Sequence, residues 1–371
     1  MSRLEELVAK LCPDGVGYKS LGEICKITRG RVMSKEYLRD NPGEYPVYSS
    51  QTANNGVFGF IDSFDYDYES ITWTTDGANA GSVFYHNNEK FSITNVCGLI
   101  KVLDKKQVNA RFIYYYLQIT TKNYVNDGMG NPKLMSNVIA SLKIPLPPLP
   151  VQQEIVRILD NFTELTAELT AELTARKKQY EYYRNRLLTF GENVPRAKLV
   201  DIADISRGVR VVKKQLRPDG AYPVYQNCLA PMGYFDKYNC DANATYVISA
   251  GAAGEVGFCD KDFWAADDCL VFSNPNGIIN KYIYYFLMTK QDFIRSNVRK
   301  ASIPRLSRMV IENLKIPLLA LDEQARIVDI LDRFDTLCND LTSGIPAEIE
   351  ARRKQYEYYR DKLLTFKEAS A

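Results

Sequence analysis

One segment of 16 residues occurs twice in this chain with almost no change. Residues 175–190 read ARKKQYEYYRNRLLTF and residues 351–366 read ARRKQYEYYRDKLLTF, so 13 of 16 positions are identical. Shorter matches precede each copy in the same order, ICKITRG with IADISRG and EYPVYSSQ with AYPVYQNC. The copies lie about 175 residues apart, well beyond the period of about 20–50 residues that marks a solenoid. The chain is therefore predicted to consist of two similar units, each a globular domain followed by a helix.

Each globular domain is predicted to be a compact α+β fold of mixed strands and helices, at residues 1–149 and 191–318. The segments at 70–86 and 244–260 place a Gly-rich centre between runs of β-branched and aromatic residues. That pattern predicts two strands joined by a turn. A helix rich in apolar and aromatic residues is expected after each hairpin, at 111–119 and 281–289.

Residues 150–190 and 319–371 are predicted to form two long helices that pack on each other. Apolar side chains after IPLPPLP step by four and three residues, which is a heptad seam. The seam residues of the first helix are Ile155, Leu159, Phe162, Leu169, Leu173, Tyr180, Tyr183 and Leu187. Such a stripe needs a partner, and the second copy carries Ile327, Leu331, Phe334, Cys338 and Leu341 in the same phase. An insertion of four residues near Pro346 predicts that the second helix stops and restarts there.

If the two helices are antiparallel, they form a coiled-coil spacer with one domain at each end and approximate two-fold symmetry. The first helix contains ELTAELTAELTA at 164–175, a tetrapeptide repeat. One tetrapeptide lengthens a helix by about 6 Å, comparable with one or two base-pair steps of roughly 3.4 Å. Adding or removing one is therefore expected to change the distance between the domains.

In combination, these motifs resemble one protein family, the specificity (S) subunits of type I restriction–modification systems. IPLPPLPVQQEIVRILD and its counterpart IPLLALDEQARIVDILD resemble the start of the family's conserved helices, and RKKQYEYYR…LLTF resembles their end. The order of variable domain and conserved helix, repeated once, covers essentially the whole chain. The second copy departs from the pattern where LLALDEQ replaces PLPPLPVQQ, a change expected to alter the linker and not the role.

The resemblance implies a division of tasks between this chain and its partners. Each globular domain would be a target-recognition domain that reads one half of a bipartite double-stranded DNA sequence. The helices would set the spacing and dock two modification (methyltransferase) subunits, and restriction (translocase/nuclease) subunits would join through the complex. The chain itself would hold no cofactor, whereas the modification subunits would use S-adenosylmethionine.

The residues themselves indicate a binding protein and not an enzyme. The single histidine, His86, lies beside a predicted turn and is expected to be a solvated loop side chain. GxSxG, HExxH and GxxxxGK[ST] motifs do not occur, and the stretches GANAGS and GAAGEVG are better explained as turns. Eight scattered cysteines without a CxxC pair indicate reduced thiols in a cytoplasmic protein, with neither disulfides nor a metal site. The sequence also lacks the run of about 18 apolar residues that a membrane span requires.

The formal net charge is only +2, so a DNA-binding surface must be local. Residues 207–217 and 295–308 are basic and free of acids, and the first domain has weaker counterparts. Lys and Arg would contact phosphates, and polar side chains after the two PVY strands would contact base edges. The candidate DNA-binding residues are Arg29, Arg31, Lys35, Gln51, Asn54 and Lys133 in the first domain and Arg207, Arg210, Lys213, Lys214, Gln226, Asn227, Arg299, Lys300 and Arg305 in the second. Ordinary solvated loop charges and turn chemistry are the alternative for these residues.

The repeated Tyr-rich segments are the candidate docking surfaces for partner subunits. Their residues are Tyr180, Tyr182, Tyr183, Arg184, Tyr356, Tyr358, Tyr359 and Arg360. The two copies are nearly identical while the globular domains differ, which favours a common docking task for two copies of one partner. The alternative is a solvated helix face with tyrosines lying over the seam.

Three other functions stay open at this stage. The chain could serve a related system in which one partner chain carries both methylation and cleavage. It could be a coiled-coil adaptor without DNA contact, or a self-contained enzyme, although the missing motifs argue against the last.

Overall fold

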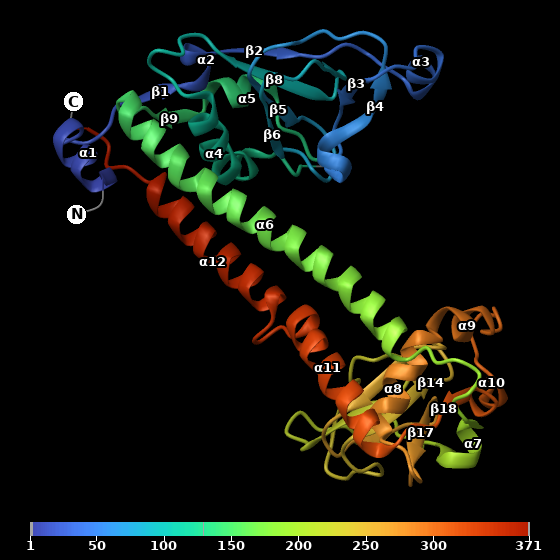
Figure 1. The fold of residues 1–371 in the computed structure, drawn as a ribbon. Coiled ribbons are helices and arrows are strands. Elements are labelled where there is room, and N and C mark those ends of the chain that lie inside the picture. The colour runs from blue at the N-terminus through green and yellow to red at the C-terminus, as the bar shows by residue number, and fades with distance from the viewer. Residues whose placement is uncertain (1–2, 129, 370–371) are drawn as a thin grey trace. The chain divides into compact units, whose positions relative to one another are not determined.

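The computed structural model describes residues 3–128 and 130–369, which belong to two compact units (Figure 1). Unit 1 comprises Met1–Glu168 and Glu350–Ala371, and unit 2 comprises Leu169–Ile349. Each unit therefore combines one globular domain with parts of both predicted helices. The Tyr-rich segment at 175–190 belongs to unit 2, whereas its copy at 351–366 belongs to unit 1.

Unit 1 is built on a four-stranded antiparallel sheet with the order β2-β8-β5-β6. Its strands are β2 (Cys25–Arg29), β5 (Ser70–Thr74), β6 (Val83–His86) and β8 (Cys97–Val102). A three-stranded sheet of order β4-β3-β7 consists of β3 (Tyr45–Tyr48), β4 (Val57–Ile61) and β7 (Ser92–Ile93), with β7 parallel to β3. A further pair joins β1 (Tyr18–Ser20) to β9 (Lys143–Pro145). The predicted hairpin at 70–86 is confirmed, because β5 and β6 pair in antiparallel register.

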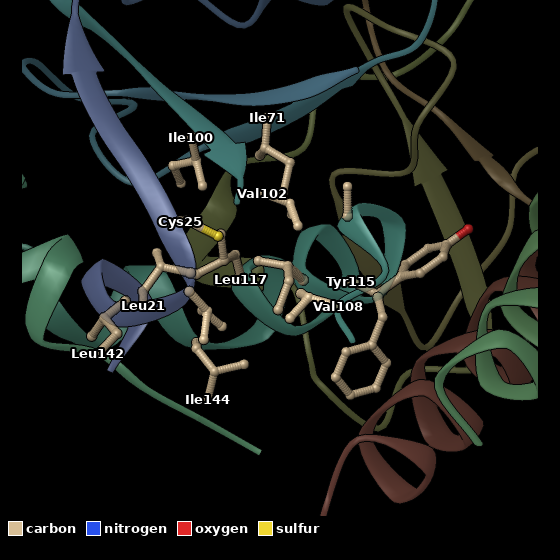
Figure 2. Close-up of a cluster of buried hydrophobic side chains, with 14 of the residues drawn as sticks. Leu21, Cys25, Ile71, Ile100, Val102, Val108, Tyr115, Leu117, Leu142 and Ile144 are labelled. Atoms are coloured by element: carbon tan, nitrogen blue, oxygen red, sulfur yellow. The ribbon is translucent and has the colours of Figure 1, made fainter. Parts of the chain in front are cut away.

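The helices of unit 1 are α1 (Arg3–Leu11), α2 (Leu21–Ile24), α3 (Lys35–Asp40), α4 (Ala110–Thr120) and α5 (Ser136–Ser141), with 3-10 turns η1 (Ala53–Gly56) and η2 (Thr121–Tyr124). Helix α4 confirms the helix predicted at 111–119, and the Asn109 side chain caps it by accepting bonds from Arg111 N and Phe112 N. Figure 2 shows Ile71 and Ile100 of the sheet converging on Leu117 of α4. Burial of each such side chain contributes about 1.5–3 kcal/mol.

Unit 2 repeats the topology of unit 1, with sheets of order β11-β17-β14-β15, β13-β12-β16 and β10-β18. The strands are β10 (Arg196–Lys198), β11 (Asp204–Arg207), β12 (Tyr222–Tyr225), β13 (Gly233–Phe235), β14 (Ala244–Ile248), β15 (Val256–Cys259), β16 (Trp264–Ala265), β17 (Cys269–Ser273) and β18 (Lys315–Pro317). The helices are α7 (Leu199–Ile202), α8 (Asn280–Thr289), α9 (Gln291–Ser296) and α10 (Arg308–Glu312), with a 3-10 turn η3 (Lys213–Gln215). The predicted hairpin at 244–260 and the helix at 281–289 are both confirmed.

The start of each long helix is anchored to its own domain by a buried glutamine. In unit 1, Gln152 accepts a bond from Asn109 N at 2.9 Å and donates to Pro147 O at 2.7 Å. In unit 2, Gln324 accepts from Ile279 N at 2.8 Å and donates to Leu319 O at 2.8 Å. The motifs VQQ and DEQ therefore perform the same structural task in both copies.

The long helices pair within each unit as the heptad seam predicts. Helix α6 (Leu149–Leu187) is continuous, and its first part packs on α12 (Ile345–Leu363) through Phe162 and Tyr359, with ring centroids 5.7 Å apart. Its second part packs on α11 (Leu321–Asn339), where Tyr183 stacks on Phe334 at 5.6 Å. The predicted partner, the second helical copy, is confirmed.

The second helix stops and restarts, as predicted from Pro346. Helix α11 ends at Asn339, and α12 begins at Ile345 with Pro346 in its first turn, where a missing N–H costs nothing. Asp340 holds the connection by accepting bonds from Ser343 and Thr342, and these bonds lower the pKa of its carboxyl. The prediction that Leu341 lies in the seam is wrong. It lies in this connection with 80% exposure, because the helical phase is lost after Asn339.

Candidate nucleic-acid interface

Two basic candidates of unit 1, Arg29 and Lys133, lie where backbone hydrogen bonds hold several loops together. In the loop after η2, Lys133 exchanges two bonds with Asn126, at 2.9 and 3.1 Å. The β5–β6 turn joins this loop, since Gly77 N donates to Pro132 O at 2.9 Å. We call these loops and the end of β2 loop cluster 1 (residues 29, 75–82, 126 and 130–134). Its shape is fixed by main-chain bonds, which leaves the side chains free to vary.

One acidic side chain lies close to both cations of loop cluster 1 and offsets one of their two positive charges. Arg29 Nη2 lies 3.6 Å from Asp76 Oδ2, and Lys133 Nζ lies 3.9 Å from Asp76 Oδ1. Arg29 Nη2 also donates to Asn95 O at 2.7 Å. Sequence reasoning did not single out Asp76. The sequence does contain one indication of this residue. When the two hairpin sequences are aligned, Asp76 falls opposite Ala250 of the second copy.

Arg31 and Lys35 lie in the segment that follows β2. Arg31 Nε lies 3.0 Å from Asp65 Oδ2, and Arg31 Nη1 donates to Tyr37 Oη at 3.1 Å. These bonds, first that to Tyr37 and then that to Asp65, raise the pKa of Arg31. Lys35 is exposed at the first position of α3. Arg31 is therefore paired in the structure, like Arg29.

The polar candidates of unit 1 follow β3. Gln51 is half-buried and donates to Val57 O, which ties it to β4. Asn54 is exposed, and both it and Asn55 have left-handed backbone angles, with φ of 49° and 54°. Asparagine tolerates this conformation better than most residues. The turn alone therefore explains why asparagine occupies position 54. The side chain is also exposed, so it is accessible to DNA.

Unit 2 has the same loop arrangement, which we call loop cluster 2 (residues 207, 249–255 and 299–306). Arg305 exchanges two backbone bonds with Arg299, at 2.8 and 3.1 Å. Arg305 pairs with Ala250 through an isolated antiparallel bridge, as Lys133 pairs with Asp76. The sequence match of Lys133 with Arg305 is thus confirmed, and an alanine occupies the position of the acidic residue.

The basic candidates of unit 2 lack acidic partners. Within residues 3–128 and 130–369, no carboxylate oxygen lies within 4.0 Å of their side-chain nitrogens. These exposed residues are Arg207, Arg210, Lys213, Lys214, Arg299, Lys300 and Arg305. The neighbouring Arg217 and Arg308 do pair, with Asp236 at 3.0 Å and Glu312 at 2.6 Å. Loop cluster 2 therefore presents uncompensated positive charge, which attracts phosphate.

The polar candidates of unit 2 lie next to its loop cluster. The backbone oxygen of Asn227 accepts a bond from Ala252 N at 2.8 Å, which joins the segment after β12 to the β14–β15 turn. The side chain of Asn227 is exposed and that of Gln226 is half-buried. The structure thus brings Asn227 close to the turn that carries Ala250.

The Tyr-rich segment of unit 2 divides into inward and outward residues. Tyr180 is only 6% exposed and belongs to the core of unit 2, with its ring stacked on Phe334 at 6.4 Å. Tyr183 stacks on the same Phe334, and Arg184 lies 5.4 Å over the Tyr180 ring. Tyr182, by contrast, is 58% exposed. The position of Tyr182 suits docking, whereas Tyr180 is used within its own unit.

The copy in unit 1 divides in the same way. Tyr356 is partly buried, donates to Gln118 Oε1 at 3.4 Å and has Arg360 5.6 Å over its ring. Burial raises the pKa of Tyr356 to about 12. Tyr358 is 62% exposed, and Tyr359 is also accessible although it stacks on Phe162. The sequence left open that these tyrosines simply cover the seam between the helices. That alternative fits Tyr356 but not Tyr358.

His86 is not the solvated loop side chain that the sequence predicts. It is the last residue of β6 and is 3% exposed. Its Nε2 lies 2.8 Å from Thr72 Oγ1, its Nδ1 lies 3.1 Å from Glu89 Oε2, and its ring stacks on Phe91. The prediction is wrong because His86 still pairs with Ser70 in the sheet, so its side chain points inward before the turn begins.

All eight cysteines are free thiols in the structure. Burial raises the pKa of Cys25, Cys97 and Cys269 to about 12, so these thiols stay protonated near neutral pH. In the described part of the chain, no three His, Cys, Asp or Glu side chains are grouped so that they could hold a metal ion.

The two domains thus share one fold and differ in the side chains of their loops. A family model described as the type I restriction modification DNA specificity domain matches residues 13–176 and again residues 192–351. The chain belongs to this family. It is a specificity subunit with two recognition domains, and such subunits are the non-catalytic, DNA-recognising components of type I systems.

Known specificity subunits resemble the chain over nearly its whole length. A putative type I specificity subunit of Mycoplasma pneumoniae is 34% identical over 353 residues, which cover 92% of this chain and 95% of the relative. A putative type I restriction enzyme specificity subunit of Haemophilus influenzae is 32% identical over 391 residues, covering 95% and 96% of the two chains.

The fold is also that of a solved structure. The S subunit of a type I restriction–modification system from M. genitalium superposes with a TM-score of 0.66 at 18% identity, covering 94% of this chain and 96% of that one. Across residues 3–128 and 130–369, the helices are too short or too polar to span a membrane.

Proposed function

We propose that each globular domain reads one half of a bipartite double-stranded DNA target through its loop cluster. The domains at 1–149 and 191–318 act as separate readers, and the helices at 150–190 and 319–371 fix the gap between the two half-sites. The observation that carries this proposal is the pair of loop clusters, which share their backbone bonds but present different side chains. A common frame with divergent side chains suits two readers of different sequences.

The chemistry of the candidates divides between affinity and readout. Arg207, Arg299 and Arg305 are exposed and have no ion-pair partner among the residues that the structure describes. They are therefore available to phosphates, which supply affinity without sequence information. Gln226 and Asn227 carry both a donor and an acceptor, the combination that reads adenine in the major groove.

The outward tyrosines are proposed to dock the partners. Tyr182 of unit 2 and Tyr358 of unit 1 occupy matching positions of the two repeats and are both exposed. Exposed Tyr and Arg side chains are enriched at interface centres. Two modification subunits bound there would methylate adenine with S-adenosylmethionine, and restriction subunits would join through them. Host DNA is the substrate of methylation, so the complex would act in the cytoplasm.

A domain exchange tests the modular part of this proposal. Residues 191–318 are replaced with the second domain of another family member, and the methylated sequence is mapped across a host genome with and without the chimaeric gene. We expect one half of the methylated sequence to change and the other half to persist. A change in both halves would contradict two independent readers.

A deletion within ELTAELTAELTA tests the spacing role of the helix. This repeat lies within the continuous helix α6, so loss of one tetrapeptide shortens the helix by about 6 Å. We expect the same two half-sites to be methylated with a different spacer between them. An unchanged methylated sequence would show that the helix is not the ruler.

Binding measurements separate this function from that of an adaptor without DNA contact. The chain is purified with its modification subunits, and its affinity for a duplex target is measured from 50 to 200 mM salt. Each phosphate contact contributes about −0.9 to the slope of log K against log salt concentration. A flat dependence, or no binding, would favour the adaptor.

A further inference from the structure

Asp76 occupies an unusual place for an acid in a DNA-reading surface. Its carboxylate lies between two candidate DNA contacts, 3.6 Å from Arg29 and 3.9 Å from Lys133, and its side chain is 20% exposed. Thr75 Oγ1 donates to Asp76 Oδ2 at 2.7 Å and so fixes the carboxylate. Within the described residues, no hydrogen bond reaches Asp76 Oδ1. One oxygen is therefore anchored, and the other can accept a bond.

A fixed carboxylate has opposite effects on the two parts of DNA. It repels phosphates and partly cancels the attraction of the adjacent Arg29 and Lys133 for the backbone. It also accepts hydrogen bonds, and the exocyclic amino groups of cytosine and adenine are the donors exposed in the major groove. Guanine and thymine present only acceptors or a methyl group at the same positions, so they leave the carboxylate unpaired.

We propose that Asp76 is a specificity-determining residue of unit 1, which accepts a hydrogen bond from the amino group of a cytosine or adenine in its half-site. This inference rests on the proposed function of the loop clusters. Asp76 lowers the affinity for DNA in general and raises the discrimination between bases, because a base without an amino group meets a repulsive carboxylate instead of a neutral side chain. Ala250 holds the matching position in unit 2 and imposes no such restriction.

Unit 2 does contain acids in and near its loop cluster, Glu255, Asp267 and Asp268, and they are arranged differently. Ser249 N donates to the backbone oxygen of Asp268 at 2.7 Å, so Asp268 contributes its main chain there. The neighbouring Asp267 has one buried carboxylate oxygen without a hydrogen-bond partner among the described residues. Neither carboxylate lies within ion-pair distance of Arg207 or Arg305. The pairing of an acid with both cations thus belongs to loop cluster 1.

A reciprocal pair of substitutions tests the inference in the complex with modification subunits. Asp76→Ala removes the acid from loop cluster 1, and Ala250→Asp places an acid at the matching position of loop cluster 2. Asp14→Ala removes an exposed acid of unit 1 outside the loop cluster and serves as the matched control. Asp76→Asn keeps the shape of the side chain, so a comparison with Asp76→Ala separates charge from packing.

Affinity is measured for the mapped target and for duplexes altered at each position of both half-sites, over a range of salt. For Asp76→Ala we expect tighter binding to all duplexes and a steeper salt slope, by about 0.9 for each cation that gains a phosphate. At one position of one half-site, the wild-type complex should prefer its cytosine or adenine over other bases by a factor of about 5 to 150. In Asp76→Ala this preference should fall to near unity. Ala250→Asp should weaken binding and flatten the slope, and Asp14→Ala should change neither.

The outcomes separate this inference from the function on which it rests. If Asp76→Ala keeps its discrimination at every position of both half-sites, the inference is overturned while the proposed function stands. If the wild-type complex shows no sequence preference, the proposed function fails and the inference fails with it. Folding is checked by thermal unfolding. If Asp76→Ala is unstable, Asp76→Asn still tests the charge, because it should tighten binding and steepen the salt slope, and an unchanged slope would contradict the inference.

Discussion

Loop cluster 1 and loop cluster 2 have the same main-chain bonds but opposite arrangements of charge. In the first, Arg29 and Lys133 lie beside Asp76, whereas in the second no acid of the described chain lies within 4.0 Å of their counterparts Arg207 and Arg305. The bonds that shape both loops join backbone atoms, so substitution of a side chain leaves the shape intact. A duplicated domain can therefore change what it reads without rebuilding its frame.

The interiors of the two domains differ in a similar way. Unit 1 packs His86 against Tyr48 and Phe91 beside the main sheet, with a polar bond to Thr72. In the matching place of unit 2, Tyr225, Tyr246 and Phe263 form a cluster of three aromatic rings. The sheet order is unchanged, which shows that topology tolerates a polar network or an aromatic cluster at the same site.

The largest expected difference between the two domains lies in the electrostatics of DNA binding. Replacing Arg207 and Arg305 with alanine removes two positive charges, whereas replacing Arg29, Asp76 and Lys133 together removes only one net charge. We expect the salt slope to flatten by about 1.8 for the first variant and about 0.9 for the second, with a correspondingly larger loss of affinity for the first. Binding to a duplex target from 50 to 200 mM salt measures both, and equal losses would contradict the comparison.

The shared frame itself can be broken at one glycine in each unit. A Cβ on Gly30 would lie 2.1 Å from Ile93 O, and one on Gly208 would lie 2.2 Å from Ala265 O. Because backbone atoms cannot move aside easily, we expect Gly30→Ala and Gly208→Ala each to destabilise the protein by about 3 kcal/mol. Gly17→Ala is the control, since no atom of the described residues lies within 4 Å of its added Cβ. Urea unfolding measures the loss, and a cost in only one unit would argue against a common frame.

Much of the fold follows from local sequence patterns. The Gly-rich hairpins, the helices after them and the restart at Pro346 depend on neighbouring residues, so a single sequence predicts them. The failures occur at element ends. His86 was assigned to the turn that follows it, and Leu341 was placed in a helix that had ended at Asn339.

The candidate site was less predictable because its contacts join distant segments. Arg29, Asp76 and Lys133 come from three separate loops, so the sequence identified the cations but not the acid between them. In the Tyr-rich repeats, composition suggested docking for the whole segment. Packing against Phe334 then distinguishes Tyr180, which is buried, from Tyr182, which is exposed.

A smaller expected effect comes from the buried polar network of unit 1. His86→Ala removes the hydrogen bond to the buried Thr72 hydroxyl and the stacking on Phe91. We expect a loss of about 2 kcal/mol in the free energy of unfolding. Cys259→Ala, at the matching end of β15, should cost less because its side chain is smaller. If the two losses are equal, the polar network adds nothing to the stability of unit 1.

The smallest expected effect concerns the pH dependence of stability. The polar network around His86 should make the stability of unit 1 depend on pH, whereas the aromatic cluster of unit 2 should not. The hydrogen bond from His86 lowers the pKa of Glu89 below 4.5, against the opposing effect of burial, and the bond from Tyr48 adds to the lowering. Because the pKa is lower in the folded state, this stabilisation is complete above pH 4.5 and is lost as the pH falls through the folded-state value. We expect the stability difference between the wild type and Glu89→Gln to shrink as the pH falls below 4.5. Thermal unfolding at stepped pH measures it. A difference that stays constant down to pH 3 would show that the carboxylate of Glu89 gains nothing from its two partners, and the polar network would then be a matter of packing alone.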